Sequence, residues 1–326
     1  MLYDSFHRIH NYLRISLTDN CNLRCSYCMP EEEYEFTPHN RLMQASEIEE
    51  ISKIFVSLGV NKIRLTGGEP LVRKDVREIL SRLSALPVSL TMTTNATRID
   101  TYIDDLISSG IQSINISLDT LDRNKFILLT RRDLFDTVKS NIHLLLSKGI
   151  KVKINMVALK GVNDNEILEF VAWTKEQPIH VRFIEFMPFT GNKWNKEKVI
   201  TWQEILEMIS EKYTIESLAR KEHDTAKKYH VKGFKGTFAV ISTMSAPFCG
   251  DCNRIRLTAD GKIKNCLFSK TEADLLSAYR RGENIEALIR ANIHSKNEAL
   301  GGQFIADLEK VNSNFIENRS MINIGG

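Results

Sequence analysis

Residues 12–29 read YLRISLTDNCNLRCSYCM, in which a β-rich run, Tyr12 to Leu17, leads into a loop with three cysteines spaced C-x-x-x-C-x-x-C. A structural zinc site normally has four ligands, and no fourth ligand stands at finger spacing near Cys21, Cys25 and Cys28. Three thiolates suit a [4Fe-4S] cluster, which takes up to four cysteine ligands, and leave its fourth iron open to a small molecule. The stretch therefore predicts an iron-sulfur cluster in the loop after the first strand.

Five more β-rich runs follow this strand and alternate with helix-period segments up to Met187. Repeated strand-helix alternation predicts a parallel sheet with right-handed crossovers. Six such units are too few for a complete eight-unit barrel, so the expected fold class is α/β, a partial (βα)6 TIM-like barrel. The expected strands are Tyr12 to Leu17, Lys62 to Thr66, Ser89 to Thr93, Ser113 to Leu118, Val152 to Val157 and Val181 to Glu185. The expected helices are Ile48 to Leu58, Val76 to Leu83, Ile99 to Ile107, Phe135 to Leu146 and Ile167 to Trp173.

The pattern changes after Met187, where an α+β region is expected in place of further βα units. We therefore expect two domains, a barrel at 1–190 and a C-terminal region at 191–326. An Asp-Gly pair between two β-rich runs is a strong signal for a hairpin. The elements expected in the C-terminal region are a helix at Trp202 to Ile209, a hairpin at Arg254 to Leu267 that turns at Asp260-Gly261, and helical structure from Thr271 to Ile293.

The other three cysteines, Cys249, Cys252 and Cys266, lie in this C-terminal region. One interpretation is half of a zinc ribbon, but the fourth ligand that such a site needs is missing. The predicted hairpin brings Cys266 back toward Cys252. We therefore interpret this group as the ligands of a second [4Fe-4S] cluster, again with one iron free.

The composition excludes several classes of protein. Hydrophobic residues make up 42% of the 326 positions and charged residues 26%, which is typical of soluble globular proteins. Lys+Arg 44 against Asp+Glu 41 gives a net charge of +3 without a basic run longer than two, so neither a nucleic acid nor a membrane surface is an expected partner. No run of about 18 apolar residues predicts a membrane span, and the N-terminus lacks the apolar core of a secretory signal. We expect a cytoplasmic protein, in which disulfides are disfavoured.

Several stretches of the sequence resemble motifs of one enzyme superfamily and of one family within it. The first cysteine group with its Tyr27 resembles the signature of the radical S-adenosylmethionine superfamily, and Gly67-Gly68-Glu69-Pro70 resembles the GGEP motif of that superfamily. From Leu13 to Gly326 the chain resembles the GTP 3′,8-cyclase family, also called molybdenum cofactor biosynthesis protein A. The stretches that carry this likeness are KIRLTGGEP at 62–70, RFIEFM at 182–187, PFCGDC at 247–252 and the terminal Gly-Gly.

The resemblance implies a lyase of the radical type with two [4Fe-4S] clusters and S-adenosylmethionine as cofactors. In the family, one electron from the first cluster cleaves S-adenosylmethionine to a 5′-deoxyadenosyl radical, which removes hydrogen from C3′ of GTP. The C3′ radical adds to C8 of the guanine, which the free iron of the second cluster holds, and the product is 3′,8-cyclo-7,8-dihydro-GTP. This is the first step of molybdopterin biosynthesis. An electron donor, the enzyme that takes the product, and a second copy of the chain in a homodimer are therefore expected partners.

The resemblance also implies the site residues. Arginine offers a planar fork that suits phosphate oxygens, and Arg254 and Arg256 alternate along a strand and so face the same way. Gly325 and Gly326 match a tail that reaches the active site and is needed for activity. Ala96 stands where the family often has glycine, for which we expect a small change in the loop. The implied contacts to S-adenosylmethionine are Tyr27, Gly68, Ser117 and Met187, and those to GTP are Arg14, Arg64, Thr93, Lys153, Arg254 and Arg256.

Two other functions compete with this interpretation. A radical enzyme with two clusters that modifies a peptide would usually carry more auxiliary cysteines than the three present here. A non-catalytic metal-binding or electron-transfer protein would need neither the arginines nor the GGEP run.

Overall fold

The computed structural model describes residues 1–29 and 34–325. Within these ranges twelve strands form one sheet in the order β12-β11-β10-β1-β2-β3-β4-β5-β6-β9-β8-β7. The strands are β1 Tyr12–Ser16, β2 Lys62–Thr66, β3 Ser89–Thr94, β4 Ser113–Ser117, β5 Lys151–Ala158, β6 His180–Glu185, β7 Ile215–Ser217, β8 Lys227–Val231, β9 Thr237–Ile241, β10 Arg254–Leu257, β11 Lys262–Lys264 and β12 Ala273–Asp274. The helices are α1 Ala45–Ser57, α2 Val76–Ser84, α3 Ile99–Ser108, α4 Arg123–Thr130, α5 Phe135–Ser147, α6 Ile167–Trp173, α7 Trp202–Ser210, α8 Leu275–Arg280, α9 Ile285–His294 and α10 Met321–Ile324.

The six predicted barrel strands are confirmed, and β1 to β6 pair in parallel in chain order. Helix α1 shows why the sequence folds this way, because Ile48, Ile51 and Phe55 recur at helical spacing and are fully buried. Its first turn is closed by a capping box between Gln44 and Glu47. The partial (βα)6 barrel is therefore the observed architecture of the first half of the chain.

Strands of the C-terminal region extend this same sheet at both edges. β10 pairs in parallel with β1, and β9 pairs in parallel with β6. A hairpin was predicted at Arg254 to Leu267, and β10 and β11 are indeed antiparallel there. β8 and β9 also pair antiparallel. The parallel pairing to the barrel edges was not predicted, because no local pattern signals a partner this distant in the chain. The sheet runs continuously across the proposed boundary at 190, and the division into two domains stays a prediction.

The hairpin turn at Asp260-Gly261 is confirmed, with Gly261 at φ 72°. The expected helical stretch from Thr271 to Ile293 is wrong at its start, which forms the short edge strand β12. The stretch is also broken between α8 and α9, where Gly282 adopts φ 75°. Glycine takes this left-handed conformation without strain, so it ends a helix readily.

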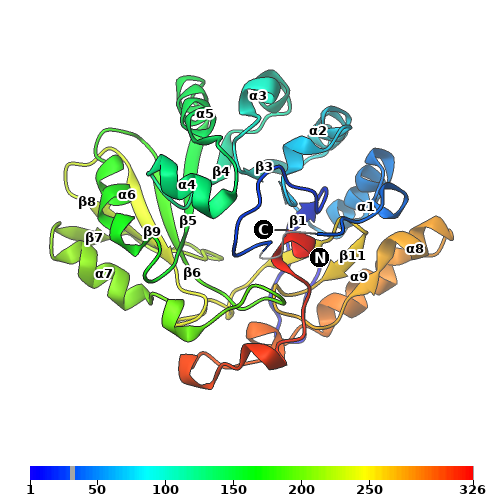
Figure 1. The fold of residues 1–326 in the computed structure, drawn as a ribbon. Coiled ribbons are helices and arrows are strands. Elements are labelled where there is room, and N and C mark those ends of the chain that lie inside the picture. The colour runs from blue at the N-terminus through cyan, green and yellow to red at the C-terminus, as the bar shows by residue number, and fades with distance from the viewer. Residues whose placement is uncertain (30–33, 326) are drawn as a thin grey trace.

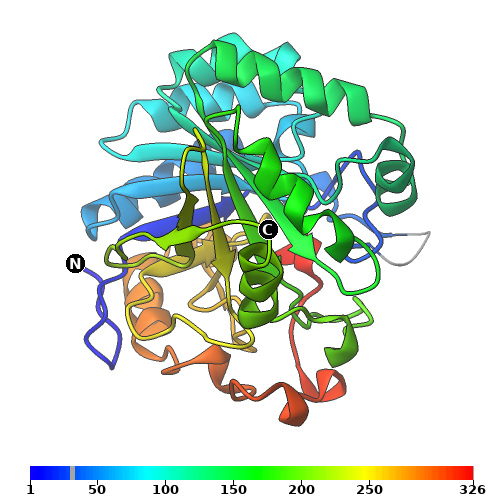
Figure 2. The ribbon, with the colours of Figure 1, turned by 90° about the vertical axis from the view of Figure 1, so that its left-hand side faces the viewer.

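The helices α1 to α6 form an arc outside the strands, and the C-terminal end lies on the inner side of that arc (Figure 1). Turned by 90°, the orange segments and most of the red segment lie opposite the cyan helices, and the last red stretch returns to the middle of the molecule (Figure 2). Within the described ranges, none of the helices has the length and apolar character needed to cross a membrane.

Candidate functional site

A cavity of about 300 Å³ lies against the inner face of the sheet, where the barrel strands meet the C-terminal region. It is lined by side chains from β1, β2, β4, β5, β6 and β10 and by the segment that carries the second cysteine group. Six of the predicted ligand-binding residues are among the lining side chains, namely Arg14, Arg64, Lys153, Met187, Arg254 and Arg256.

Strand register explains why three of the arginines meet. Arg14 on β1 stands directly beside Arg64 on β2 and beside Arg256 on β10. Side chains at the same register of neighbouring parallel strands point to the same face. The structure therefore brings together three guanidinium groups that are 50 residues or more apart in the sequence.

The electrostatics of the cavity favour an anion. Burial, reinforced by Arg64, lowers the pKa of Arg14 to about 10. Burial together with Arg182 and Arg64 lowers the pKa of Lys153 to about 8. A cation in this cavity is poorly hydrated and repelled by its neighbours, and the attraction of a multiply charged anion would offset both effects. A triphosphate meets this requirement.

Two cations of the cavity were missed by the sequence analysis, Lys62 on β2 and Arg182 on β6. The Nε and Nη2 atoms of Arg182 are buried and have no hydrogen-bond partner among the described residues. Burial, followed by repulsion from Arg64, lowers its pKa to about 9. Strand alternation could have indicated both residues. Lys62 precedes Arg64 by two positions and so faces the same side of β2, and Arg182 lies between two buried apolar residues of β6.

The second cysteine group lines the same cavity, since Cys249, Cys252 and Cys266 all face it. The Cys252 Sγ accepts hydrogen bonds from Arg254 Nη2 at 3.1 Å and from Lys296 Nζ at 3.3 Å. Burial alone would raise the pKa of Cys252, but Arg254 and Lys296 outweigh it and lower that pKa to about 6. The thiolate is the form that binds iron, so this group fits a cluster beside the cationic cavity.

The first cysteine group lies in the loop after β1, in an acidic environment. Burial raises the pKa of Cys21 to about 11, with Glu69 adding to the rise. Burial also raises the pKa of Cys25, and the neighbouring Cys28 and Asp119 raise it further. Thiols gathered this closely become thiolates only if cations join them, and the irons of a cluster supply that charge. The donor set therefore fits the predicted [4Fe-4S] cluster.

The positions of the sulfurs bear on the kind of metal site that each cysteine group could form. In residues 1–29 and 34–325, no three side chains of His, Cys, Asp or Glu converge as the ligands of a single ion. In a [4Fe-4S] cluster, each thiolate binds a different iron, so the three sulfurs stand further apart.

The predicted contacts to S-adenosylmethionine are less closely grouped. Met187 lines the central cavity, and the Tyr27 hydroxyl donates to Asp119 Oδ2 at 2.8 Å. A Cβ on Gly68 would lie 2.4 Å from the Asn20 carbonyl oxygen, so this glycine is needed for its close contact with the cysteine loop. Whether Gly68 also contacts a ligand stays a prediction.

Two more predicted contacts, Ser117 and Thr93, do not line the cavity. Ser117 ends β4, and Thr93 accepts from the Asn115 amide at 3.5 Å, with Asn115 itself lining the cavity. Thr93 is thus the register neighbour of a cavity residue, and the assignments of Ser117 and Thr93 remain predictions.

The C-terminal tail enters the site. Met321 lines the cavity, Ile322 and Ile324 are buried, and the Gly325 carbonyl accepts a hydrogen bond from Arg256 Nη1. Gly326 lies outside the described residues. The tail of α10 therefore reaches one of the predicted GTP-binding arginines, and a role of Gly325 in the reaction stays a prediction.

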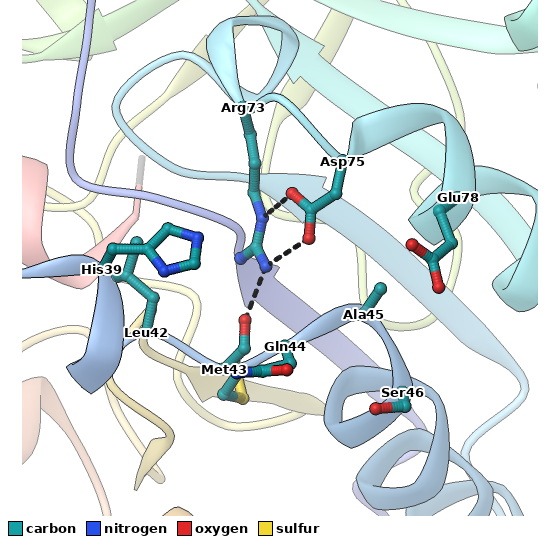
Figure 3. Close-up of a pocket in the computed structure, with 9 residues that line it drawn as sticks. All are labelled: His39, Leu42, Met43, Gln44, Ala45, Ser46, Arg73, Asp75 and Glu78. Carbon is teal, nitrogen blue, oxygen red and sulfur yellow. Dashed lines mark hydrogen bonds and ion pairs between the residues drawn. The ribbon is translucent and has the colours of Figure 1, made fainter.

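A smaller pocket of about 130 Å³ lies between the start of α1 and the start of α2 (Figure 3). Arg73 in its wall donates to both Asp75 carboxylate oxygens, at 2.7 and 2.9 Å, and to the Met43 carbonyl oxygen at 2.6 Å (Figure 3). It also donates to the Leu17 carbonyl oxygen at 2.6 Å. Arg73 therefore links β1 to the loops around it and has its donors occupied by Asp75 and two backbone carbonyl oxygens.

Comparison with known proteins agrees with this geometry. Residues 15–174 match the Radical SAM superfamily, and residues 179–301 match the family described as Molybdenum Cofactor Synthesis C. The solved structure of Streptococcus suis SuiB bound to S-adenosylmethionine superposes with a TM-score of 0.60 at 20% identity, covering 87% of this chain and 68% of SuiB. This likeness shows the fold.

Three relatives cover nearly the whole chain. The mitochondrial GTP 3′,8-cyclase of Arabidopsis thaliana is 45% identical and covers 100% of this chain and 84% of its own length. The GTP 3′,8-cyclase of Thermodesulfovibrio yellowstonii is 42% identical, with 91% of this chain and 95% of its own length covered. Molybdenum cofactor biosynthesis protein 1 of Mus musculus is 44% identical over 99% of this chain, which spans only 51% of the length of that protein. By its sequence, fold and cysteine groups, the chain belongs to the GTP 3′,8-cyclase family of the radical S-adenosylmethionine superfamily.

Proposed function

We propose that this protein is a radical S-adenosylmethionine cyclase that converts GTP to 3′,8-cyclo-7,8-dihydro-GTP, the first step of molybdenum cofactor biosynthesis. The observation that carries the proposal is the cavity, in which a row of arginines and the second cysteine group face the same space. A triphosphate and a purine base are the two ends of GTP, and the cavity has a distinct environment for each.

Membership of the superfamily implies S-adenosylmethionine and one [4Fe-4S] cluster as cofactors. When bound, they would supply a 5′-deoxyadenosyl radical able to take the C3′ hydrogen of GTP; bond formation between C3′ and C8, with uptake of one electron from the electron donor and one proton, would then give the product. We assign the first cluster to Cys21, Cys25 and Cys28 and a second cluster to Cys249, Cys252 and Cys266. The second cluster is supported by the low pKa of Cys252 and by its position in the cavity wall.

The residues of the chain bind and orient the substrate. We assign the triphosphate to Arg14, Arg64 and Arg256, whose guanidinium groups share one register, with Lys153 and Arg182 completing the charge. Charge-assisted hydrogen bonds to phosphate are directional and hold the nucleotide in one position. The base is then left at the second cysteine group, and holding C3′ and C8 in fixed geometry is the main contribution of the protein to the rate.

Gly325 supports the same arrangement from the other side. A Cβ on Gly325 would lie 2.8 Å from Ser16 Cβ and 2.8 Å from Thr66 Oγ1, at the ends of β1 and β2 next to the first cysteine loop. Ile324 belongs to an apolar cluster against which Tyr27, Cys249 and Cys266 pack, so we expect the tail to help enclose a bound nucleotide.

Anaerobic incubation of the reduced, reconstituted protein with S-adenosylmethionine and GTP tests the proposal. We expect 5′-deoxyadenosine and a cyclised nucleotide in equal amounts. Formation of 5′-deoxyadenosine without a GTP-derived product would contradict the assigned substrate and favour a peptide substrate. Stoichiometric zinc without iron in anaerobically purified protein would contradict the radical chemistry itself. A cytoplasmic location, an electron donor, transfer of the product to the next pathway enzyme and a homodimer are further predictions of this function.

A further inference from the structure

Lys296 follows α9 and is buried in the C-terminal region, with 3% of its surface exposed. Its Nζ donates to Cys252 Sγ at 3.3 Å and to the Arg254 carbonyl oxygen at 3.3 Å. No carboxylate of the described ranges forms an ion pair with it. The nearby Asp4 is engaged by Arg8 at 2.6 Å and by His10 at 2.9 Å.

A buried ammonium group without a counter-ion is strongly unfavourable. The only groups that Lys296 contacts through Nζ in the described structure are a carbonyl oxygen and a sulfur, and of these only the sulfur can carry a full negative charge. The same sulfur also accepts from Arg254 Nη2 at 3.1 Å. Two cationic donors are therefore directed at one of the three sulfurs of the second cysteine group.

The first cysteine group has a different environment. Cys21 Sγ accepts a hydrogen bond from the neutral Asn95 amide at 3.7 Å, and the charged groups that act on Cys21 and Cys25 include the acids Glu69 and Asp119. Hydrogen bonds to a cluster sulfur and positive charge near it stabilise the more negative, reduced cluster and raise its reduction potential. Arg24 also acts on Cys21, so the first group has charges of both signs around it, whereas Cys252 receives hydrogen bonds from two cations.

We propose that Lys296 is a positioning residue of the second cluster, which holds the Cys252 thiolate in place and raises the reduction potential of the cluster through its charged hydrogen bond to that sulfur. The inference rests on the proposed function, in which the second cysteine group binds a [4Fe-4S] cluster. Arg254 shares the sulfur but also lines the cavity, whereas Lys296 does not line it. Lys296 therefore acts on the cluster and not on GTP directly.

The test uses the full chain with Cys21, Cys25 and Cys28 replaced by serine, so that only the second cluster contributes to the spectra. Its potential is measured by redox titration followed by electron paramagnetic resonance, in otherwise unchanged protein and in Lys296→Met, Lys296→Gln and Lys296→Arg. We expect Lys296→Met to lower the ratio of reduced to oxidised cluster at least tenfold at a given potential. This change corresponds to a reduction potential lower by about 59 mV for a one-electron couple. Lys296→Gln, which keeps a donor without the charge, should shift in the same direction by less, and Lys296→Arg should stay close to the parent.

Lys264 provides a matched control. It is a second buried lysine of the same region, 1% exposed, but its Nζ binds the Ser269 carbonyl oxygen at 2.6 Å and Glu272 at 3.3 Å instead of a sulfur. Lys264→Met should reduce stability and leave the potential nearly unchanged.

The outcomes separate the inference from the function on which it rests. An unchanged potential in both Lys296→Met and Lys296→Gln would overturn the inference, as would an equal shift in Lys264→Met. If Lys296→Met bound no iron, the other two variants would still test the inference, which requires a higher reduction potential in Lys296→Arg than in Lys296→Gln. Absence of iron from the parent with intact Cys249, Cys252 and Cys266 would instead refute the second cluster of the proposed function.

Discussion

Arg256 of β10 donates from Nη1 to the carbonyl oxygen of Gly325, so that an arginine assigned to the triphosphate also holds the end of the chain. Both residues are buried, and Arg256 stands beside Arg14 in the register of β1 and β10. The tail is thereby attached to the same row of cations that we assign to the substrate. Changes in the tail should therefore affect the reaction more than the fold.

Gly325→Ala is expected to impair cyclisation. Gly325 adopts φ 82°, and an added Cβ would meet Ser16 and Thr66 at 2.8 Å, so the tail must move. A left-handed alanine costs about 1–2 kcal/mol, which corresponds to roughly a tenfold loss of turnover if the tail acts only in its present position. Deletion of Gly325 and Gly326 should reduce turnover further, with iron content unchanged.

The matched control for this change is Gly282→Ala. Gly282 has a similar φ of 75° between α8 and α9, and a Cβ there would meet nothing within 4 Å. It should cost similar backbone strain but leave turnover as it is. Full cyclase activity of the truncated protein would show that the glycines are an ordinary chain end.

The two cysteine groups should fail in different ways. Cys28→Ser should abolish cleavage of S-adenosylmethionine, since the first cluster loses a ligand. Cys266→Ser should leave that cluster assembled and cleaving, and should lose the cyclised nucleotide. Iron content, 5′-deoxyadenosine and nucleotide product are measured together. Loss of cleavage in both variants would show that the second group is structural for the first.

Arg182→Met should stabilise the substrate-free protein and weaken GTP binding. Two nitrogens of Arg182 are buried without a partner in the described ranges, so replacing this charge with a side chain of similar volume should raise the free energy of unfolding by on the order of 1 kcal/mol. Loss of a charge-assisted contact of about 1.5 to 3 kcal/mol should weaken GTP binding roughly ten- to a hundred-fold.

Thermal unfolding without ligand and calorimetric titration with GTP and guanosine check these two effects of Arg182→Met. Arg182→Lys, which keeps the charge, is the control and should retain most of the GTP affinity. Guanosine binding should change little in either variant. Equal loss of affinity for GTP and guanosine would contradict the assignment of Arg182 to the phosphates.

GTP binding should weaken as the pH rises above about 8. Burial and the neighbouring Arg182 and Arg64 lower the pKa of Lys153 to about 8 in the free protein, from an ordinary value of 10.5. The unfolded chain then binds more protons than the folded one between these values, so Lys153 destabilises the free protein most below pH 8 and less as the pH rises toward 10.5. A bound triphosphate favours the charged lysine, so binding takes up a proton in the same range.

Calorimetry in buffers of different ionisation enthalpy measures this proton uptake. Lys153→Arg should keep its charge to higher pH and remove part of the pH dependence. Equal proton uptake in the parent protein and in Lys153→Arg would show that another group takes up the proton.

Ala96→Gly should stabilise the protein. Ala96 replaces the glycine often found in the family, and the structure holds it at φ 61°, where its carbonyl accepts from the Asn141 amide at 2.8 Å and its N–H donates to Thr94 Oγ1 at 3.0 Å. Because these bonds fix the backbone, the residue bears the strain of the left-handed conformation, and relieving it is worth about 1 kcal/mol. Chemical denaturation measures the gain, and a loss of stability would mean that the lost burial of the Ala96 methyl group and the larger flexibility of glycine in the unfolded chain outweigh the strain.

The sequence alone determined the local elements and the ligand types. The strand from Tyr12 and the spacing of Cys21, Cys25 and Cys28 predicted the first cluster loop, because cysteine spacing within one loop sets which sulfurs can reach one cluster. The Asp260-Gly261 turn was predicted because two adjacent residues decide it. Such features depend on residues that are close together in the chain, so the local sequence pattern is enough to predict them.

The tertiary structure alone decided which distant residues share the site. β10 joins the barrel edge beside β1, and this pairing sets Arg256 next to Arg14 and carries Cys252 to the cavity wall. Arg182 was missed because a charged residue on a strand reads as a surface residue until the inner face of the barrel is known. Contacts between strands more than 200 residues apart leave no period in the sequence, since they arise from the closing of the sheet and the burial of its inner face.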